Sequence, residues 1–375
     1  MWLGLDDTDS LEEGCTTLEF YKLLQNLPCK YGQPRLVRLW PFASRRTRGN
    51  AALAVEIDCD ADIVEWLDKY WKDNLEPLKG KISKSHHSDR QQFPADPGMV
   101  LFESQPSEEV YWSTVRGEFG FTDGGWQWGG SGRIGATAAC AWREHSVTWE
   151  GIAWRKNERF VSPDAIIEVD SWPETFLCRD PRTTRGLVAP RGTCPVMFGV
   201  RTDSRESCVK ATKLLSEHED TAPIIAWMVF STNQTSGDHI LESRTCVIET
   251  IELRKGGHVE LNNSILSFHD GGDVNSIAQW LQLGDSIEYI GLEFDSMIHL
   301  EAIKVLKSIK MERPICECGS RMKSMGKNQG LRCPSCKLVT ADLWVKSTRK
   351  PPIEGWAQPP VDKRRHLARD WSKQP

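Results

Sequence analysis

Three carboxylates crowd a short stretch near the N-terminus of this 375-residue chain, where Asp6, Asp7 and Asp9 follow the apolar residues 2–5. Like charges this close repel one another unless a cation lies among them. Mg²⁺ prefers hard oxygen ligands and is usually held by a few carboxylates together with substrate phosphates. The spacing therefore favours a magnesium and phosphate site. A loop of Asx turns is the alternative, because it has nearly the same sequence pattern.

The segment after this acidic loop predicts a helix whose start suits a phosphate. Residues 15–27 carry apolar side chains at helical spacing, and Thr16 or Thr17 stands at the beginning. The free N–H groups and the dipole of a helix N-terminus favour a phosphate. Metal and phosphate can therefore meet at one place. The alternative is a threonine that only caps the helix.

A basic loop forms a second candidate phosphate contact. Arg45, Arg46 and Arg48 are followed directly by Gly49 and Asn50. Arginine pairs bidentately with phosphate, and glycine allows a close backbone approach. The alternative is an exposed basic loop between two strands.

A glycine-rich stretch forms a third candidate phosphate contact. Residues 124–132 precede a predicted small-residue helix at 134–142, with Gly132, Arg133 and Gly135 at the junction. Backbone N–H groups of such a loop can cradle phosphate, although the Lys-Ser/Thr of a Walker loop is absent. A flexible turn is the alternative.

Four of the 12 cysteines form two close pairs, Cys316 with Cys318 and Cys333 with Cys336. This spacing predicts a tetrahedral four-thiolate Zn²⁺ site, which is structural because four protein ligands leave no open position. The other eight stand singly: Cys15, Cys29, Cys59, Cys140, Cys178, Cys194, Cys208 and Cys246. No basic region followed by an apolar stretch begins the chain. We therefore expect no secretory signal, a cytoplasmic location and reduced single thiols.

Charge is distributed unevenly. The net charge is −5, yet residues 301–375 hold 17 Lys and Arg against 7 Asp and Glu. A basic end on an acidic body indicates a polyanionic partner held by that end. For the Pro-rich residues 349–375, a solvated and partly disordered tail is an equal alternative. No apolar run is long enough to span a bilayer, so no membrane partner is expected.

Strands and helices alternate over the first ~145 residues and predict an α/β or α+β domain. Expected strands lie at 2–5, 36–39, 51–57 and 99–102, and expected helices at 15–27, 63–70 and 134–142. A strand at 147–154 alternates like an edge strand. Strands at 196–200 and 224–230 around a helix at 207–215 suit a small α+β domain.

Strands then predominate up to residue 292. The expected strands lie at 226–232, 245–253, 258–261, 264–269 and 286–292. Closely spaced strands with Gly-rich turns suit a small barrel, of which the oligonucleotide-binding (OB) barrel is common. A helix at 298–308 is expected to link this barrel to the cysteine pairs.

A polar segment at 231–239 stands at the entrance to these strands. Its side chains can read bases or sugar hydroxyls, as in proteins that recognise RNA. A solvated loop is the alternative.

Several motifs occur together in a recognisable order. They are residues 4–10 with 14–17, 47–52, 134–136, 189–192 with 195–201, 232–235 and 321–327. This ordered set, over roughly residues 1–340, resembles the archaeal isoleucine-tRNA 2-agmatinylcytidine synthetase (TiaS) family.

The resemblance implies an α+β multidomain protein. The implied parts are a kinase-like α/β catalytic domain at 1–145, a ferredoxin-like domain at 146–221, an OB fold at 222–300, a zinc ribbon at 310–346 and a basic tail at 347–375. The OB fold and the zinc ribbon are expected to hold tRNA.

The resemblance also implies an activity. ATP activates the carbon-2 carbonyl of the wobble cytidine in an isoleucine tRNA with a CAU anticodon, and agmatine displaces the activated oxygen. The product is 2-agmatinylcytidine, which reads AUA, and ATP ends as AMP and phosphate. Phosphorylating a poor electrophile of this kind requires metal-clamped phosphates.

The resemblance assigns roles by motif. Asp6, Asp7 and Asp9 handle Mg²⁺ and phosphate transfer, and Thr16 matches the threonine that becomes phosphorylated. The implied contacts with nucleotide or phosphate are Thr17, Arg48, Gly49, Asn50, Gly132, Arg133 and Gly135. The implied zinc ligands are Cys316, Cys318, Cys333 and Cys336.

Two departures from the family pattern concern binding sites. The first cysteine pair is Cys-x-Cys where the family usually has Cys-x-x-Cys, so a different zinc geometry is expected. Residues 192–195 lack the aspartate of the family's Gly-Pro-Asp-Pro, so any agmatine at that loop needs another carboxylate.

Two other functions compete with this hypothesis. One is a non-catalytic nucleic-acid-binding protein built on the OB fold and the zinc ribbon. It has no use for three clustered carboxylates, which repel phosphate without a metal. The other is a small-molecule kinase, which yields ADP rather than AMP.

Overall fold

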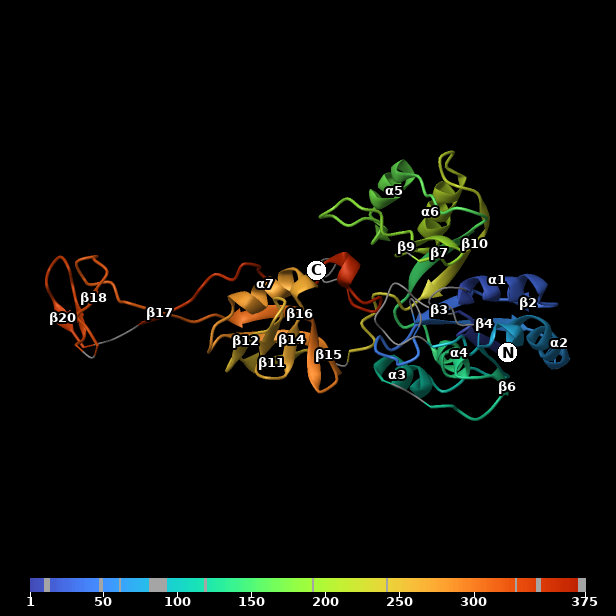
Figure 1. The fold of residues 1–375 in the computed structure, drawn as a ribbon, viewed down its shortest axis with the longest axis horizontal. Coiled ribbons are helices and arrows are strands. Elements are labelled where there is room, and N and C mark those ends of the chain that lie inside the picture. Colours follow the sequence, from blue (N-terminus) through green and yellow to red (C-terminus); the bar gives the residue numbers. More distant parts are fainter. Residues whose placement is uncertain are drawn as a thin grey trace. The chain divides into compact units, whose positions relative to one another are not determined.

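The computed structural model describes residues 1–9, 14–46, 50–60, 62–80, 93–117, 120–190, 192–240, 242–327, 329–341 and 345–369 (Figure 1). The chain divides into two compact units, one formed by Met1–Leu241 with Arg365–Pro375 and the other by Glu242–Arg364. Among the described residues, no helix is both long enough and apolar enough to cross a membrane.

Within the described residues, ten strands form one sheet in the first unit. In sheet order they are β6 (Trp126–Gly129), β5 (Gly98–Phe102), β1 (Trp2–Asp6), β4 (Ala51–Asp58), β3 (Arg35–Arg38), β10 (Ile224–Thr232), β7 (Thr148–Arg155), β9 (Val196–Thr202) and β8 (Thr175–Phe176), with β2 (Lys30–Tyr31) paired to β4. Neighbours are antiparallel except β3 and β10, which run parallel. This parallel pair joins the strands of residues 1–145 to those that follow.

The helices of the first unit cover this sheet. They are α1 (Thr16–Asn26), α2 (Ile63–Tyr70) continuing into η1 (Trp71–Leu75) and η2 (Glu76–Leu78), α3 (Glu108–Arg116), α4 (Gly132–Ala141), α5 (Pro163–Asp170) and α6 (Arg205–Glu217). Side chains of α5 and α6 share a buried cluster with those of β7 and β9.

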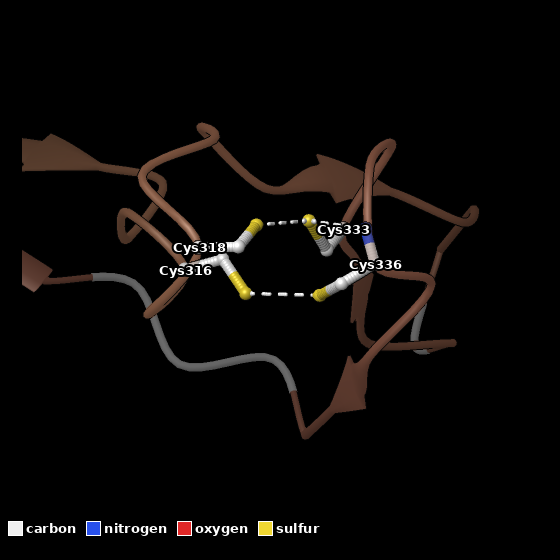
Figure 2. A group of neighbouring side chains, drawn as sticks. All are labelled: Cys316, Cys318, Cys333 and Cys336. Atoms are coloured by element: carbon white, nitrogen blue, oxygen red, sulfur yellow. Dashed lines mark hydrogen bonds between the residues drawn. The ribbon is translucent and has the colours of Figure 1, made fainter.

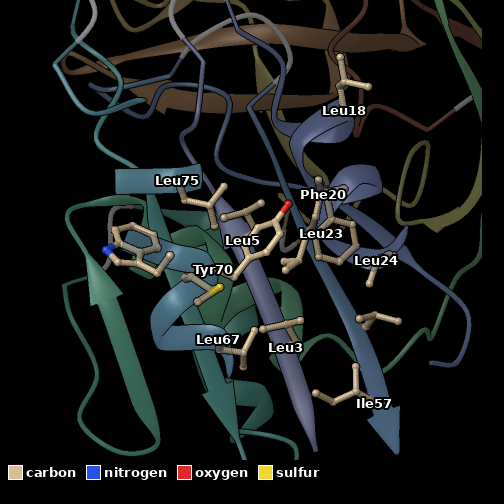
Figure 3. Close-up of a cluster of buried hydrophobic side chains, with 14 of the residues drawn as sticks. Leu3, Leu5, Leu18, Phe20, Leu23, Leu24, Ile57, Leu67, Tyr70 and Leu75 are labelled. Atoms are coloured by element: carbon tan, nitrogen blue, oxygen red, sulfur yellow. The ribbon is translucent and has the colours of Figure 1, made fainter. Parts of the chain in front are cut away.

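Alternating residues of β1 separate two cores, because successive side chains of a strand point to opposite faces. Leu3 and Leu5 pack with side chains of α1 and α2 (Figure 3). On the other face α4 packs against β1 and β4, where Ala52 and Ala54 are small. A Cβ at Gly4 would lie 2.5 Å from the carbonyl oxygen of Ala136. Small residues therefore let α4 approach the strand that ends at the acidic loop.

The second unit contains a sheet of seven described strands. The order is β11 (Arg244–Val247), β15 (Ser286–Phe294), β16 (Met297–Lys307), β14 (Ile265–Ser267), β13 (Val259–Leu261) and β12 (Ile251–Leu253), with β22 (Trp356–Ala357) paired to β16. Helix α7 (Asp273–Trp280) follows η3 (His269–Gly271) and shares the buried core of these strands. The short helix η4 (Val361–Lys363) ends the unit.

The cysteine module is built from short strands. β17 (Lys310–Glu312) pairs with β21 (Val345–Ser347), and β18 (Lys323–Ser324), β19 (Leu331–Arg332) and β20 (Val339–Thr340) form a small sheet. Its buried cluster consists of Cys316, Met322, Leu331 and Cys333. So small an apolar core calls for a further stabilising element.

The prediction of a helix at 298–308 is wrong, because these residues form β16. Phe294 pairs with Met297 across a two-residue turn, and the turn residues Asp295 and Ser296 have φ of 53° and 62°. Positive φ at both central positions is the hairpin turn that matches strand twist. The hairpin with β15 therefore overrides the helical appearance of the segment.

Two strands lie elsewhere than the sequence predicts. β7 is not an edge strand, since it pairs with β10 on one side and β9 on the other. β10, predicted partly as the first barrel strand, pairs with β7 and β3 in the first unit. Residues 222–232 therefore belong to the first unit rather than to the barrel.

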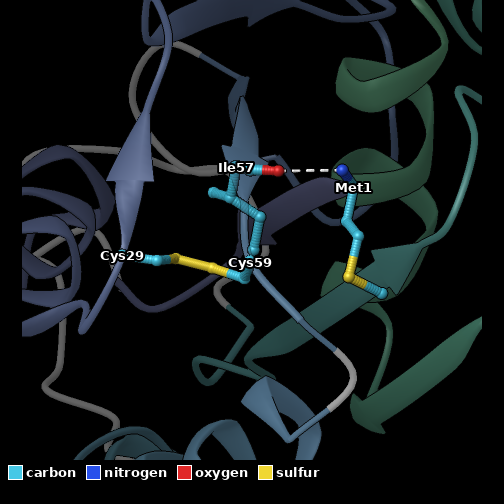
Figure 4. Close-up of a disulfide and its surroundings, with 4 residues drawn as sticks. All are labelled: Met1, Cys29, Ile57 and Cys59. Atoms are coloured by element: carbon cyan, nitrogen blue, oxygen red, sulfur yellow. Dashed lines mark hydrogen bonds between the residues drawn. A yellow bond between two sulfur atoms is a disulfide. The ribbon is translucent and has the colours of Figure 1, made fainter.

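Cys29 and Cys59 are joined by a disulfide, so the prediction of a reduced thiol is wrong at these two positions (Figure 4). The cause is strand pairing, because Lys30 of β2 lies opposite Asp58 of β4 and brings the preceding and following cysteines together. Their Cα atoms are 5.6 Å apart.

The alternative of a solvated C-terminal tail is also wrong for its described part. Trp356 and Ala357 pair with β16 in the second unit, and Ala357 is 2 % exposed. Leu367 is 1 % exposed in a core cluster of the first unit. The tail is therefore folded into both units up to residue 369.

Candidate active site and zinc module

The acidic loop begins where β1 ends. Asp6 closes the strand, and Asp7 has a φ of 57°, a conformation that L side chains rarely adopt. The Asp7 N–H donates to Asp6 Oδ1 at 2.7 Å. Strained backbone of this kind persists where the surroundings fix it, as they do at many functional sites.

Thr16, the first residue of α1, is held by the acidic loop. Its hydroxyl donates to Asp9 Oδ1 at 2.7 Å and accepts from Thr8 Oγ1 at 3.2 Å. The N-cap of α1 is Cys15, and no side chain caps the helix. Thr16 is therefore no helix cap, and its hydroxyl is oriented by a carboxylate.

Helix α4 begins directly beside the acidic loop. A Cβ at Gly135 would lie 2.0 Å from Asp6 Oδ2, and one at Gly132 would lie 2.5 Å from the Asp6 carbonyl oxygen. Ser131 Oγ donates to Asp7 Oδ2 at 3.3 Å. A Cβ would meet backbone atoms at Gly132 and the Asp6 carboxylate at Gly135, so the glycine-rich stretch and the carboxylates form one site.

Burial and mutual repulsion perturb these carboxylates. Burial raises the pKa of Asp6 well above its usual value, and the charge of Asp7 adds to this. Burial also raises the pKa of Asp7 to about 7, with a contribution from Asp9 and an opposing one from Arg45. Both groups are therefore costly to ionise without a nearby positive charge.

Two adjoining cavities lie along the acidic loop. The first, of about 150 Å³, is lined by Asp6, Asp7, Leu39, Trp40, Ala43, Ser44, Arg45, Asn50, Ala51, Thr114, Gly117, Ser131, Gly132, Ile134 and Gly135. The second, of about 340 Å³, is lined by Asp9, Cys15, Thr16, Thr17, Leu36, Arg38, Asn50, Ala51, Glu150, Ile152, Leu187, Val188, Pro190, Cys194, Val196, Gly199, Arg201 and His366. Asn50 and Ala51 line both. Asp6 and Asp7 thus face one cavity, while Asp9 and Thr16 face the other.

A buried charge cluster forms part of the second cavity. Glu150 is 2 % exposed and pairs with Arg38 at 2.7 Å and with Arg201 at 3.2 Å. Burial would raise the pKa of Glu150, but Arg38 and Arg201 lower it to about 2. The three side chains come from β3, β7 and β9, so the cluster ties both halves of the sheet together.

The polar segment at 231–239 supports this cluster instead of reading bases or lying in solvent. Asn233 is fully buried, and its amide exchanges hydrogen bonds with the Arg38 backbone at 2.7 and 3.0 Å. Gln234, with its amide oriented to suit both neighbours, donates to Glu150 at 3.2 Å and accepts from Arg201 at 2.8 Å. Both interpretations of this segment from sequence are therefore wrong for these buried residues.

Only some of the predicted nucleotide contacts are found beside the two cavities. Arg48 and Gly49 lie outside the described residues. Asn50 has a φ of 41°, and its amide donates to the Trp40 carbonyl at 2.6 Å at the boundary between the cavities. Thr17 Oγ1 accepts from Trp154 Nε1 at 3.2 Å beside the second cavity.

Arg133 is engaged away from both cavities. Its guanidinium donates to the Gly130 carbonyl at 3.1 Å and to Gln127 Oε1 at 3.2 Å, and it covers the Phe121 ring. The positive charge that does line the first cavity belongs to Arg45.

The four clustered cysteines form the zinc module (Figure 2). Their sulfur atoms all lie within 4.8 Å of one another, and the Cys316–Cys336 and Cys318–Cys333 pairs are 3.4 Å apart. Tetrahedral Zn²⁺ with Zn–S bonds of about 2.3 Å has sulfur atoms about 3.7 Å apart. The Cys-x-Cys spacing therefore still supplies a donor set that fits Zn²⁺.

Comparison with known proteins gives three family models along the chain. The TiaS TCKD domain matches residues 2–123, the TiaS FLD domain matches 130–239, and the TiaS C-terminal zinc ribbon domain matches 313–347. A relative from Pyrobaculum neutrophilum, named as the isoleucine-tRNA 2-agmatinylcytidine synthetase TiaS, is 30 % identical over 90 % of this chain and 87 % of its own length.

The chain belongs to the TiaS family.

Other members agree over the whole length. The TiaS of Methanosarcina acetivorans is 29 % identical over 100 % of this chain and 97 % of its own. The crystal structure of apo TiaS is 25 % identical with a TM-score of 0.74, covering 100 % of this chain and 97 % of that one. The mixed α+β fold is thus the TiaS fold, and the four cysteines fall within the matched TiaS zinc ribbon.

The shape of the loop at 192–195 is set by arginines. Cys194 is 2 % exposed, and its carbonyl accepts from Arg155 at 3.1 Å and from Arg159. Arg159 also donates to the carbonyl oxygens of Pro190, Gly192 and Val196. Guanidinium groups of the chain itself therefore occupy these carbonyls.

Sequence reasoning missed several residues that line the second cavity. Arg38, Glu150 and Arg201 interrupt apolar strands, and a charged residue inside a buried strand is the signal that identifies them. His366 reaches the second cavity from the far end of the chain, and no local pattern marks it.

Proposed function

We propose that this chain is an isoleucine-tRNA 2-agmatinylcytidine synthetase. It uses ATP to conjugate agmatine to carbon 2 of the wobble cytidine in an isoleucine tRNA with a CAU anticodon. The observation that carries the proposal is the pair of cavities that share Asn50 and Ala51, with Asp6 and Asp7 on one side and Thr16 on the other. Curated relatives aligned over nearly the whole chain carry this name.

The first cavity is the proposed nucleotide site. Asp6 and Asp7 have oxygen donors, and their raised pKa values mark a place where a divalent cation relieves repulsion. This donor set fits Mg²⁺, which when bound neutralises phosphate charge. Arg45 supplies a fixed positive charge beside them, and Ser131, Gly132 and Gly135 at the start of α4 line the same cavity.

Thr16 is the proposed acceptor of a phosphoryl group. Its hydroxyl already donates to Asp9 Oδ1, so this carboxylate can take the proton when the oxygen attacks phosphorus. Both residues line the second cavity, where the cytidine and agmatine are proposed to meet.

The proposed domains follow from the family and the two units. A kinase-like domain covers residues 1–145, and a ferredoxin-like domain runs from 146 to the end of the first unit. An OB fold begins at Glu242 and precedes the zinc ribbon. The basic C-terminal part of the chain supplies the charge needed to hold the tRNA backbone.

The direct test incubates the full chain with ATP, agmatine and the isoleucine tRNA transcript and analyses the wobble nucleoside by mass spectrometry. Asp7→Asn is expected to abolish 2-agmatinylcytidine formation. Asp73→Asn is the matched control, because Asp73 is exposed on η1. Unmodified cytidine while ATP is consumed would refute the substrate assignment, and ADP as the nucleotide product would favour a small-molecule kinase.

A further inference from the structure

A short segment that lies outside both cavities contacts several residues that line the first one. We call residues 93–98 the supporting segment, which ends at Gly98, the first residue of β5. Gly98 pairs with Asp6 of β1 on one side and with Gly129 of β6 on the other. All six residues belong to the described part of the chain, and none of them lines either cavity. Any effect of this segment on the site is therefore exerted through its neighbours.

The supporting segment binds three successive N–H groups at the end of the glycine-rich stretch. Asp96 Oδ2 accepts from the Ser131 N–H at 2.7 Å, and the Asp96 carbonyl accepts from the Gly132 N–H at 3.0 Å. The Pro97 carbonyl accepts from the Gly130 N–H at 2.8 Å. Ser131 and Gly132 both line the first cavity. The start of α4 is therefore held in place by residues that do not themselves line the cavity.

Glycines on both sides permit this close approach. A Cβ at Gly130 would lie 2.0 Å from Asp96 Oδ1, and its three nearest atoms would all belong to the Asp96 carboxylate. A Cβ at Gly98 would lie 1.9 Å from the backbone nitrogen of Arg133. The glycine at position 130 is therefore fitted to the carboxylate of Asp96, and a methyl group there would displace that carboxylate.

The Asp96 carboxylate uses both of its oxygens. Oδ1 forms an ion pair with Lys79 Nζ at 3.2 Å, while Oδ2 holds the Ser131 N–H. An N–H bond to a carboxylate is charge-assisted and is stronger than one to a neutral acceptor. The Ser131 hydroxyl in turn donates to Asp7 Oδ2 at 3.3 Å. A series of contacts therefore runs from Asp96 through Ser131 to Asp7, a carboxylate of the proposed nucleotide site.

The same segment holds the arginine of the first cavity. Arg45 Nη2 donates to the Pro94 carbonyl at 3.3 Å, and the Arg45 guanidinium lies 5.1 Å from the centroid of the Phe93 ring. Arg45 lines the first cavity beside Asp7. The supporting segment thus contacts the arginine, the start of α4 and, through β5, the strand that ends at Asp6.

We propose that Asp96 is a positioning residue of the first cavity, where its carboxylate fixes Ser131 and, through Ser131, orients Asp7 for nucleotide and metal. This role rests on the proposed function of that cavity. Without the carboxylate, the start of α4 can leave the position that suits the nucleotide. The measured affinity then falls by the fraction of molecules that keep this position.

The experiment compares the full-length chain with three variants by calorimetric titration of a non-hydrolysable ATP analogue in the presence of Mg²⁺. Asp96→Ala loses one charge-assisted hydrogen bond, so the affinity is expected to fall about tenfold to a hundredfold. Asp96→Asn retains most of the affinity, because its amide oxygen still accepts from Ser131 although the charge is gone. Gly130→Ala weakens binding as Asp96→Ala does, because its methyl group displaces the carboxylate.

The double variant Asp96→Ala/Gly130→Ala provides the decisive comparison. Once residue 96 is alanine, the methyl group at position 130 no longer meets a carboxylate. The double variant should therefore bind the nucleotide no more weakly than Asp96→Ala alone, whereas independent losses would add. This result does not depend on how stable either single variant is, because it compares two variants that both lack the carboxylate.

Controls separate this role from a general loss of stability. Asp73→Ala removes an exposed carboxylate of η1 and should keep the native affinity. The KM for agmatine should stay that of the native chain in Asp96→Ala, because agmatine is proposed to bind in the second cavity. A variant that is merely less stable would lose affinity for both substrates together.

The outcomes distinguish this role from the proposed function. Native nucleotide affinity in Asp96→Ala, additive losses in the double variant, or an equal rise of both KM values would overturn the role of Asp96. A native chain that binds the nucleotide but modifies no cytidine would overturn the proposed function and leave this role intact. A native chain that does not bind the nucleotide would overturn both.

Discussion

Replacing Glu150 by glutamine tests the buried charge cluster most directly. The carboxylate lies between two guanidinium groups, and its pKa falls from 4.5 to about 2 in the folded chain. This depression corresponds to about 3 kcal/mol of stability at neutral pH. Glutamine keeps the shape but leaves two buried positive charges without their counter-charge, so a loss of about 3–5 kcal/mol is expected.

The sign of the pH dependence follows from the depressed pKa. The contribution is fully present above the unfolded value of 4.5 and is lost as the pH falls towards 2. The stability difference between the native chain and Glu150→Gln should therefore shrink by about 1 kcal/mol between about pH 7 and about pH 3.5. Glutamine does not titrate, so only the native chain shows this change.

The assay is urea unfolding followed through the transition that exposes Trp142 and Trp154, both fully buried in the first unit. Restricting the signal to this transition matters because the chain has two units and need not unfold in one step. Glu65→Gln on the exposed surface of α2 is the control and should change stability by less than about 0.5 kcal/mol. A loss below about 1 kcal/mol at neutral pH, or one that does not shrink in acid, would refute the reasoning.

Four further outcomes are expected. Gly135→Ala should lower tRNA-stimulated ATP consumption more than about 100-fold, because its methyl group clashes with Asp6, whereas Gly120→Ala, with open space around it, should not. Leu367→Ala should cost about 2–5 kcal/mol in the same unfolding transition, and a loss near zero would show that residues 365–369 are not anchored there. Chelation should remove one Zn²⁺ per chain by atomic absorption and weaken tRNA binding, and Cys333→Ser should prevent zinc uptake. The affinity for Mg²⁺, measured by calorimetry, should rise about fivefold from about pH 6 to about pH 7, because Asp7 must lose a proton near pH 7 to bind metal. An affinity that does not change with pH would contradict the raised pKa of Asp7.

Local sequence patterns indicate the acidic loop and its neighbours because these parts are contiguous or marked by glycine. β1 stops at Asp6, α1 starts at Thr16, and the glycines of α4 are explained by single close approaches. Each of these features can be recognised from residues that lie close together in the sequence. The zinc cysteines are similar, because a short hairpin brings both pairs together.

Local sequence patterns do not predict the second cavity, because the residues that line it come from separate segments of the chain. Arg38, Glu150 and Arg201 meet only when β3, β7 and β9 enter one sheet through the parallel β3–β10 pair. A parallel pairing between distant strands depends on tertiary packing and has no local turn to announce it. β16 differs in this respect, because the short Asp295–Ser296 turn is a local signal of the hairpin that it forms with β15.

The two cavities meet at a single strand end. Asn50 immediately precedes β4 and Ala51 begins it, and both line the two cavities, so a displacement of this point changes both the proposed nucleotide site and the proposed substrate site. Asn50 is held there at a φ of 41° by its bond to the Trp40 carbonyl. The Leu39 N–H in turn donates to the Asn50 carbonyl at 2.9 Å, next to Arg38. A substitution such as Asn50→Ala removes the amide that fixes this conformation. It should therefore raise the KM values for ATP and for agmatine together.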